Sequence, residues 1–181
     1  MIQIYCGDGK GKTTAAAGLA LRAAGSGMKV IFSQFMKGND TGELHSLRQI
    51  KNIEIVRSNK QFGFYNTLTE QQKQELTQIH NEILDRLLKA TEDECCDMII
   101  LDEITYPVSF HLIDEEKLRE LLLHGHGEKF SEGSHAKETE IILTGRNPAD
   151  FMTDRADYIT EMHAVRHPFE KGIAARKGIE Y

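Results

Sequence analysis

The sequence predicts a single α/β domain with three layers, in which helices cover both faces of a mostly parallel central sheet. Apolar segments alternate with amphipathic segments along the chain, which is typical of strand–helix–strand units. Some apolar segments are continuous, as at Met98–Leu101, and this indicates strands that are covered on both faces. With 181 residues the chain has the size of one such domain, and we assign residues 1–181 to it.

The first half begins with a short apolar strand over residues 1–6 and a helix over residues 12–24. Two further strands are predicted over residues 29–36 and 53–58. The helix is indicated by apolar residues at three- to four-residue spacing: Ala16, Leu19, Ala20 and Ala23.

The clearest helix is predicted over residues 69–90. Thr69 and Gln72 have the spacing of a capping box, in which each side chain bonds the backbone of the other. One apolar stripe runs along the helix and consists of Leu76, Ile79, Ile83, Leu84, Leu87 and Leu88.

The second half continues the alternation. We expect strands over residues 97–102, 140–144 and 158–162, a helix over 114–123 and a short helix over 148–155. These elements complete the pattern of a parallel sheet, whose ligands bind beyond the carboxyl ends of the strands.

The polar segment 124–137 is predicted to be a surface loop. It contains His124, His126 and His135 but no cysteine or carboxylate partner at regular ligand spacing. A solvated loop is therefore the preferred interpretation over a metal site.

Composition narrows the class of protein. The 22 Lys and Arg against 28 Asp and Glu give a net charge of −6, which argues against a nucleic-acid binder. The three cysteines include no Cys-x-x-Cys pair, which favours a reducing cytosol. No signal peptide and no apolar run of about 20 residues is found. We therefore expect a cytoplasmic protein that binds no membrane.

A glycine-rich phosphate loop connects the first strand to the first helix, and it makes the predicted fold P-loop NTPase-like. Backbone amides of such a loop surround phosphate at a helix N-terminus, the lysine adds positive charge, and the threonine hydroxyl binds Mg²⁺. We expect ATP as the ligand. The loop is one residue shorter than the usual pattern. Its residues, all predicted to contact the nucleotide, are Gly7, Asp8, Gly9, Lys10, Gly11, Lys12, Thr13 and Thr14.

Two of these residues need separate comment. Thr13 is a predicted metal ligand, and Asp8 is expected to face a hydroxyl or a metal-bound water because a carboxylate repels phosphate.

Asp102 and Glu103 end a buried strand, the position from which P-loop proteins hold the metal. We predict Mg²⁺ coordination there, with a simple strand-end acidic pair as the alternative.

The rest of the chain resembles the P-loop-type ATP:corrinoid adenosyltransferases, which act on cob(I)alamin or cob(I)yrinic acid a,c-diamide. The resemblance covers nearly the whole chain, and the shortened loop is a feature of that family. The further motifs are Gln34-Phe35-Met36-Lys37-Gly38, Gly42-Glu43, Gly63-Phe64, Leu101-Asp102-Glu103-Ile104-Thr105-Tyr106, Thr144-Gly145-Arg146, Ala156-Asp157, Thr160-Glu161-Met162, His167-Pro168-Phe169, Gly172 and Gly178-Ile179-Glu180-Tyr181.

The resemblance implies transfer of the 5′-deoxyadenosyl group of ATP to the cobalt of a reduced Co(I) corrinoid, with release of triphosphate, in adenosylcobalamin synthesis or salvage. Cobalt is the nucleophile, so no side chain has to fill that role. Lys12 and Thr13, together with Mg²⁺, are the catalytic groups that stabilise the departing triphosphate. A homodimer and an electron-donating reductase as partner are also implied.

By the same resemblance, Phe64 is a catalytic aromatic residue beside a four-coordinate cobalt that has lost its axial ligand. The family pattern has a Trp where this chain has Asn66, so either Tyr65 substitutes or the corrinoid wall is built differently. Three polar residues match family positions that contact nucleotide or corrinoid, with surface solvation as the competing interpretation: Lys37, Glu43 and Arg146.

The residues alone leave two other functions open. One is a conventional P-loop phosphotransferase or ATPase that cleaves the γ-phosphate, and the shortened loop argues against it. The other is an ATP-gated regulatory protein, which nothing in the sequence excludes.

Overall fold

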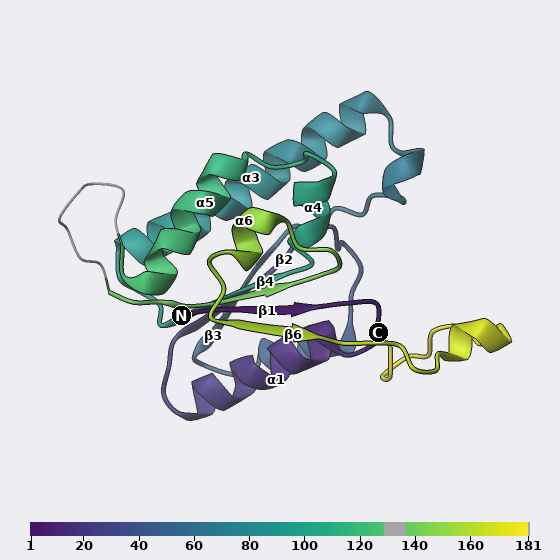
Figure 1. Ribbon diagram of the computed structural model, residues 1–181, viewed down its shortest axis with the longest axis horizontal. Coiled ribbons are helices and arrows are strands. Elements are labelled where there is room, and N and C mark those ends of the chain that lie inside the picture. Colours follow the sequence, from purple (N-terminus) through teal and green to yellow (C-terminus); the bar gives the residue numbers. More distant parts are fainter. Residues whose placement is uncertain (129–136, 181) are drawn as a thin grey trace.

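The computed structural model describes residues 1–128 and 137–180. Within these ranges six parallel strands form one sheet in the order β3-β2-β4-β5-β1-β6 (Figure 1). The prediction of a mostly parallel sheet is confirmed. The strands are β1 (Ile2–Cys6), β2 (Val30–Gln34), β3 (Ile53–Arg57), β4 (Met98–Asp102), β5 (Glu140–Thr144) and β6 (Tyr158–Glu161).

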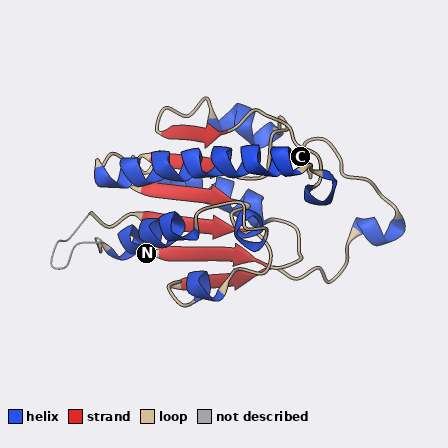
Figure 2. Ribbon diagram, turned by 90° about the horizontal axis from the view of Figure 1, so that it is seen from above, coloured by secondary structure: helices blue, strands red, loops and turns tan. Residues whose placement is uncertain are grey.

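Helices cover both faces of the sheet, so the molecule has three layers (Figures 1 and 2). α1 (Lys12–Gly25) and α2 (Gly42–Leu47) lie on one face. The other face carries α3 (Glu70–Glu92), α5 (Glu115–Leu123) and α6 (Asp150–Thr153). None of the helices in the described residues is long and apolar enough to cross a bilayer.

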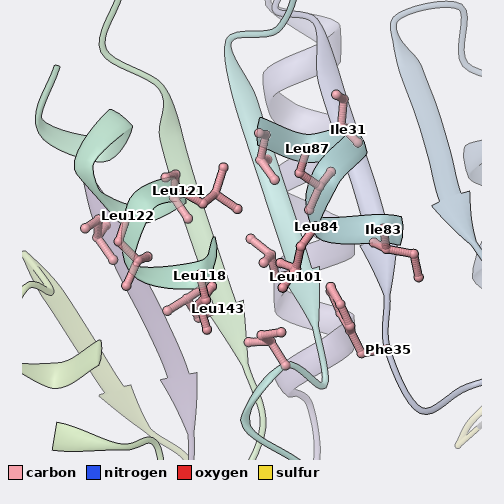
Figure 3. Packing of buried hydrophobic residues seen from close by; sticks show 14 of the residues in the cluster. Ile31, Phe35, Ile83, Leu84, Leu87, Leu101, Leu118, Leu121, Leu122 and Leu143 are labelled. Carbon is pink, nitrogen blue, oxygen red and sulfur yellow. The ribbon is translucent and has the colours of Figure 1, made fainter. Parts of the chain in front are cut away.

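The two cores follow from the period of two along each strand. In β4, Ile99 and Leu101 belong to the core under α3 and α5, whereas Met98 and Ile100 belong to the core over α1. Figure 3 shows the first core, where leucines of both helices lie over the strands. The α1 side is built from Ala16, Ala20 and Ala23, whose small side chains let the helix approach the sheet closely.

The predicted start of the long helix is confirmed in atomic detail. The Thr69 hydroxyl accepts the Gln72 amide at 3.2 Å, and the Gln72 side chain accepts the Thr69 amide at 2.9 Å. This capping box satisfies backbone donors that would otherwise lack partners at the N-terminus of α3.

Several short elements were not predicted. α2 and α4 (Thr105–Ser109) have six and five residues, too few for an apolar period to show. Three 3-10 turns, η1 (Tyr65–Thr67), η2 (His124–His126) and η3 (Pro168–Lys171), also escaped prediction. The helix expected over residues 148–155 is limited to α6.

The expectation of a surface loop over residues 124–137 is partly wrong. His124 lies in η2 and is buried, with a relative exposure of 6%. His126 Nε2 lies 3.0 Å from Asp157 Oδ2, and Lys137 Nζ lies 2.5 Å from Asp97 Oδ1. The first turn of this segment therefore belongs to the core, while His135 lies outside the described residues.

Candidate functional site

Polar side chains stand at the carboxyl ends of the strands, where open parallel sheets bind ligands. The strand register places Gln34, the last residue of β2, beside both Asp102 of β4 and Arg57 of β3. Thr144 ends β5, and its hydroxyl donates to Asp102 Oδ1 at 2.7 Å. Four neighbouring strands thus contribute to one polar edge.

The phosphate loop, residues 7–14, leads from β1 into α1 as predicted. Gly7 and Gly11 have φ values of 98° and 116°, in the left-handed region that glycine enters without cost. Gly9 is needed for a different reason, because its N–H donates to the Met162 carbonyl oxygen at 2.6 Å and an added Cβ would lie 2.7 Å from that oxygen. The loop is therefore packed tightly against the segment that follows β6.

Lys12 folds back over this loop. Its Nζ donates to the carbonyl oxygens of Gly7 at 2.8 Å and Gly9 at 2.7 Å. Burial lowers the pKa of Lys12, and the nearby Glu103 carboxylate opposes this shift. The first turn of α1 holds no acidic residue, so the helix N-terminus presents an uncompensated positive dipole end to an anion.

Asp102 is fully buried, and among the described residues four side chains donate to its carboxylate. Oδ1 accepts the hydroxyl hydrogens of Thr13 at 2.8 Å and Thr144 at 2.7 Å. Oδ2 accepts from Gln34 Nε2 at 3.2 Å and Lys37 Nζ at 2.7 Å. Because the Thr13 hydroxyl gives its hydrogen to Asp102, its oxygen lone pairs are directed away from that carboxylate.

Lys37 brings a second ammonium group to the same place. Its Nζ lies 3.1 Å from Thr13 Oγ1 and 3.6 Å from Glu103 Oε1. Burial alone would lower the pKa of Lys37, but the carboxylates of Asp102 and Glu103 outweigh burial and raise it. Burial raises the pKa of Glu103 even though Lys37 is near. These oxygens form an environment that favours a cation.

A cavity of about 450 Å³ opens beside this cluster, between α1 and residues 36–43. Phe62 and the C-terminal residues Gly178–Glu180 contribute to its walls. Four residues predicted to contact the nucleotide also line it: Thr13, Thr14, Lys37 and Glu43.

Three other predicted residues, Asp8, Lys10 and Arg146, do not line this cavity. Asp8 is exposed, and its carboxylate accepts the Ala164 N–H at 3.2 Å, which lowers the pKa of Asp8. Its carboxylate therefore bonds a backbone amide, and the expected contact with a hydroxyl or a metal-bound water stays a prediction. Arg146 Nη2 lies 3.4 Å from the Asp8 carbonyl oxygen, and Lys10 is exposed.

The predicted aromatic residues separate into two environments. Tyr65 stacks on Phe110, with ring centroids 4.0 Å apart and planes 2° from parallel. Phe64 is 88% exposed. The Tyr65 ring therefore packs against Phe110 and Lys73, whereas the Phe64 ring exposes its apolar surface to solvent.

Sequence reasoning assigned no role to three polar residues of this edge, namely Gln34, Arg57 and Thr144. Arg57 Nη1 donates to Gln34 Oε1 at 2.8 Å, which orients the Gln34 amide toward Asp102. The sequence does contain a signal that could have identified them, since each is the polar last residue of an otherwise largely apolar strand.

The same geometry can be tested for a divalent metal. Among the described residues no three His, Cys, Asp or Glu side chains converge as a metal site. Mg²⁺ in nucleotide sites takes one or two protein oxygens and completes its coordination with phosphate and water. Thr13 Oγ1 and the Glu103 carboxylate surround the Lys37 ammonium, so these oxygens already lie around one cation, and the residues fit Mg²⁺.

Comparison with known proteins identifies relatives along the entire chain. A corrinoid adenosyltransferase of Escherichia coli (strain K12) is 32% identical over 181 residues, which cover 100% of this chain and 85% of that protein. Corrinoid adenosyltransferase CobA of Salmonella typhimurium is 30% identical with the same coverage, and a corrinoid adenosyltransferase of Sinorhizobium sp is 29% identical, with 100% and 80% covered.

Among solved structures, the Aeropyrum pernix ORC2 protein in ADPNP and ADP complexes matches with a TM-score of 0.47 and 18% identity, over 90% of this chain and 41% of that chain. This similarity is too low to support a functional conclusion. The family model described as ATP:corrinoid adenosyltransferase BtuR/CobO/CobP, by contrast, matches residues 1–181. The chain therefore belongs to the ATP:corrinoid adenosyltransferase family.

Proposed function

We propose that this enzyme transfers the 5′-deoxyadenosyl group of ATP to the Co(I) centre of a reduced corrinoid and releases triphosphate. The cobalt electron pair forms the cobalt–carbon bond at C5′, while the C5′–O5′ bond breaks and its electrons leave with the triphosphate. The observation that carries the proposal is the convergence of Lys12 and Lys37 on the carboxyl edge of the sheet. Two ammonium groups and a helix N-terminus suit a polyanionic leaving group.

Different groups of the site are proposed to bind the triphosphate. Lys12 and the backbone of residues 7–14 bind the phosphates, and Lys37, whose ammonium donates to the Thr13 hydroxyl oxygen, adds a second positive charge. Because these groups are already fixed, they lower the free energy of the transition state without reorganisation. Glu43 and Arg146 extend the same site toward nucleotide or corrinoid.

Thr13 and Glu103 are the residues that we propose to hold Mg²⁺, which when bound neutralises phosphate charge. Asp102 acts differently, because all its acceptor directions are used by the donors described above. We assign to Asp102 the orientation of the Thr13 oxygen, and to Glu103 direct coordination. Burial raises the pKa of Glu103, and a metal ion bound there would offset the hydration that this carboxylate has lost.

The corrinoid has to lie where C5′ is exposed, beside the apolar surface of Phe64. An aromatic ring at the axial position would keep a nitrogen or water ligand off cobalt and thereby ease reduction of Co(II). Family membership leads us to propose a homodimer and a separate reductase as the electron donor.

The identity of the phosphate product tests this function. With ATP, Mg²⁺ and chemically reduced cob(I)alamin we expect triphosphate, and without corrinoid we expect none. Lys12→Ala should lower the rate at least about a hundredfold, because the loss of one preorganised charge at the leaving group has effects of this size. Lys51→Ala, an exposed lysine between α2 and β3, is the matched control and should keep the rate.

Formation of ADP and phosphate at a corrinoid-independent rate would identify a conventional phosphotransferase or ATPase. Tight ATP binding without any turnover would identify a regulatory protein. Either result overturns the proposed function.

A further inference from the structure

The turn after β2 has a backbone conformation at Met36 that could not be predicted from the sequence. Met36 has a φ of 56°, in the left-handed region that non-glycine residues rarely occupy. The next residue is Lys37, whose ammonium reaches Thr13 and Asp102. The direction of this ammonium group is therefore set by an unfavourable backbone conformation that the surrounding structure has to hold.

His80 contacts this turn from α3, 44 residues away in sequence. Its ring is buried, with 1% exposure, and Nε2 accepts the Met36 N–H at 3.3 Å. Nδ1 lies 3.2 Å from the Leu112 carbonyl oxygen, which can only accept a hydrogen. Both contacts are satisfied by one neutral tautomer, with hydrogen on Nδ1. Burial lowers the pKa of His80 to about 4, so this tautomer persists near neutral pH.

Other groups hold the turn downstream of Met36. Arg57 Nη2 donates to the carbonyl oxygens of Lys37 at 3.1 Å and Asn39 at 3.0 Å. Gly38 packs so closely that an added Cβ would lie 2.2 Å from the Lys60 carbonyl oxygen. These contacts fix the backbone after Lys37, and the His80 contact fixes it before Lys37.

We propose that His80 is a positioning residue of the nucleotide site, which fixes the Met36 turn and thereby holds the Lys37 ammonium beside the phosphate loop, where it faces the triphosphate. The inference rests on the proposed function only in that Lys37 faces the triphosphate. The imidazole suits this place because it accepts on one side and donates on the other. An apolar side chain would leave the part-buried Met36 N–H without this partner.

Two amide substitutions separate positioning from packing. His80→Gln places an acceptor near the position of Nε2 and can still bind the Met36 N–H. His80→Asn is one methylene shorter, so it keeps the donor near Leu112 but cannot reach Met36. The readout is the equilibrium affinity for ATP with Mg²⁺, measured together with the melting temperature of each variant.

We expect His80→Asn to weaken ATP binding about tenfold and His80→Gln about twofold, the difference being the hydrogen bond to the part-buried Met36 N–H. In a Lys37→Gln background, which removes the charge to be positioned, His80→Asn should cause no further loss. Equal losses in both His80 variants, or an undiminished loss in the Lys37→Gln background, would show that His80 is only a packing residue.

Amide hydrogen exchange of the wild-type protein provides a second measurement that needs no variant. The Met36 amide should exchange slowly because His80 accepts it, and rapid exchange would overturn the proposal even if His80→Asn fails to fold. The proposed function is decided separately, since absent adenosyl transfer would leave these binding and exchange results unchanged.

Discussion

The buried carboxylate of Asp102 shows how single residues make this site possible. A charge removed from water is costly unless partners replace its hydration. Thr13, Thr144, Gln34 and Lys37 provide those partners, and in doing so they are themselves oriented. One carboxylate therefore fixes a candidate metal ligand and an ammonium group together.

The neutral state of His80 predicts a specific dependence of stability on pH. Its pKa is about 4 in the folded protein, below the ordinary value of 6.5. Below that ordinary value the unfolded chain binds a proton that the folded protein does not, so the free energy of unfolding falls as pH falls toward 4. Between about pH 7 and about pH 5 the loss should be about 2 kcal/mol.

Urea unfolding of the wild-type protein and of His80→Gln at both pH values measures this contribution, because the other titrating groups are common to both proteins. The variant should lose less stability than the wild type as the pH is lowered. An identical pH dependence in the two proteins would mean that His80 titrates normally in the folded state.

Secondary-structure elements differ in how well the sequence predicted them. α1 and α3 were predicted because each is long enough to show an apolar period, with glycines after α1 and a capping box at the start of α3. The strands were predicted from their apolar segments, and α5 was predicted as well. α2 and α4 lack a side-chain cap and span little more than one turn. Tertiary contacts form them, and no local signal reveals those.

Phe64, in the segment after β3, is the residue that we propose to contact the corrinoid. Phe64 is exposed beside the Tyr65–Phe110 stack, so its removal should leave the core intact. Phe64→Ala should lower the rate about tenfold when Co(II) cobalamin and a reductant are supplied, because an axial ligand then stays on cobalt. With preformed Co(I) the rate should change by less than about twofold.

Leu21→Ala, which removes an exposed apolar side chain of α1, is the control and should affect neither assay. Equal losses of the Phe64 variant in both assays would contradict a role in removing the axial ligand.

The candidate site was predictable where residue type and strand position coincide. Asp102 ends β4, and the phosphate loop, Glu103 and Lys37 lie in the loops that follow strands. The structure brings these residues together, with Lys12 and Thr13 of the phosphate loop beside Lys37, Asp102 and Glu103. His80 was not predicted because it continues the apolar stripe of α3, where a histidine looks like part of the core. The left-handed turn at Met36 has no sequence signal at all.

At the level of the whole molecule, the parallel sheet explains why residues so distant in sequence meet. Since all six strands of the described residues run in one direction, their carboxyl ends share one edge. The loops after β1, β2, β4 and β5 supply the phosphate loop, Lys37, Glu103 and Arg146, respectively. The fold thus brings Lys12, Lys37 and Arg146 to one edge of the sheet, in a protein whose net charge is −6.

We propose that these cationic groups hold the triphosphate of ATP as a leaving group while cobalt attacks C5′. ATP labelled with ¹³C at C5′, incubated with Mg²⁺ and cob(I)alamin, tests it directly by ¹³C NMR of the corrinoid product. We predict that the label appears on the cobalt-bound carbon, with one triphosphate released for each labelled corrinoid. Label that remains in ADP or unreacted ATP, with no cobalt–carbon bond formed, would contradict the account.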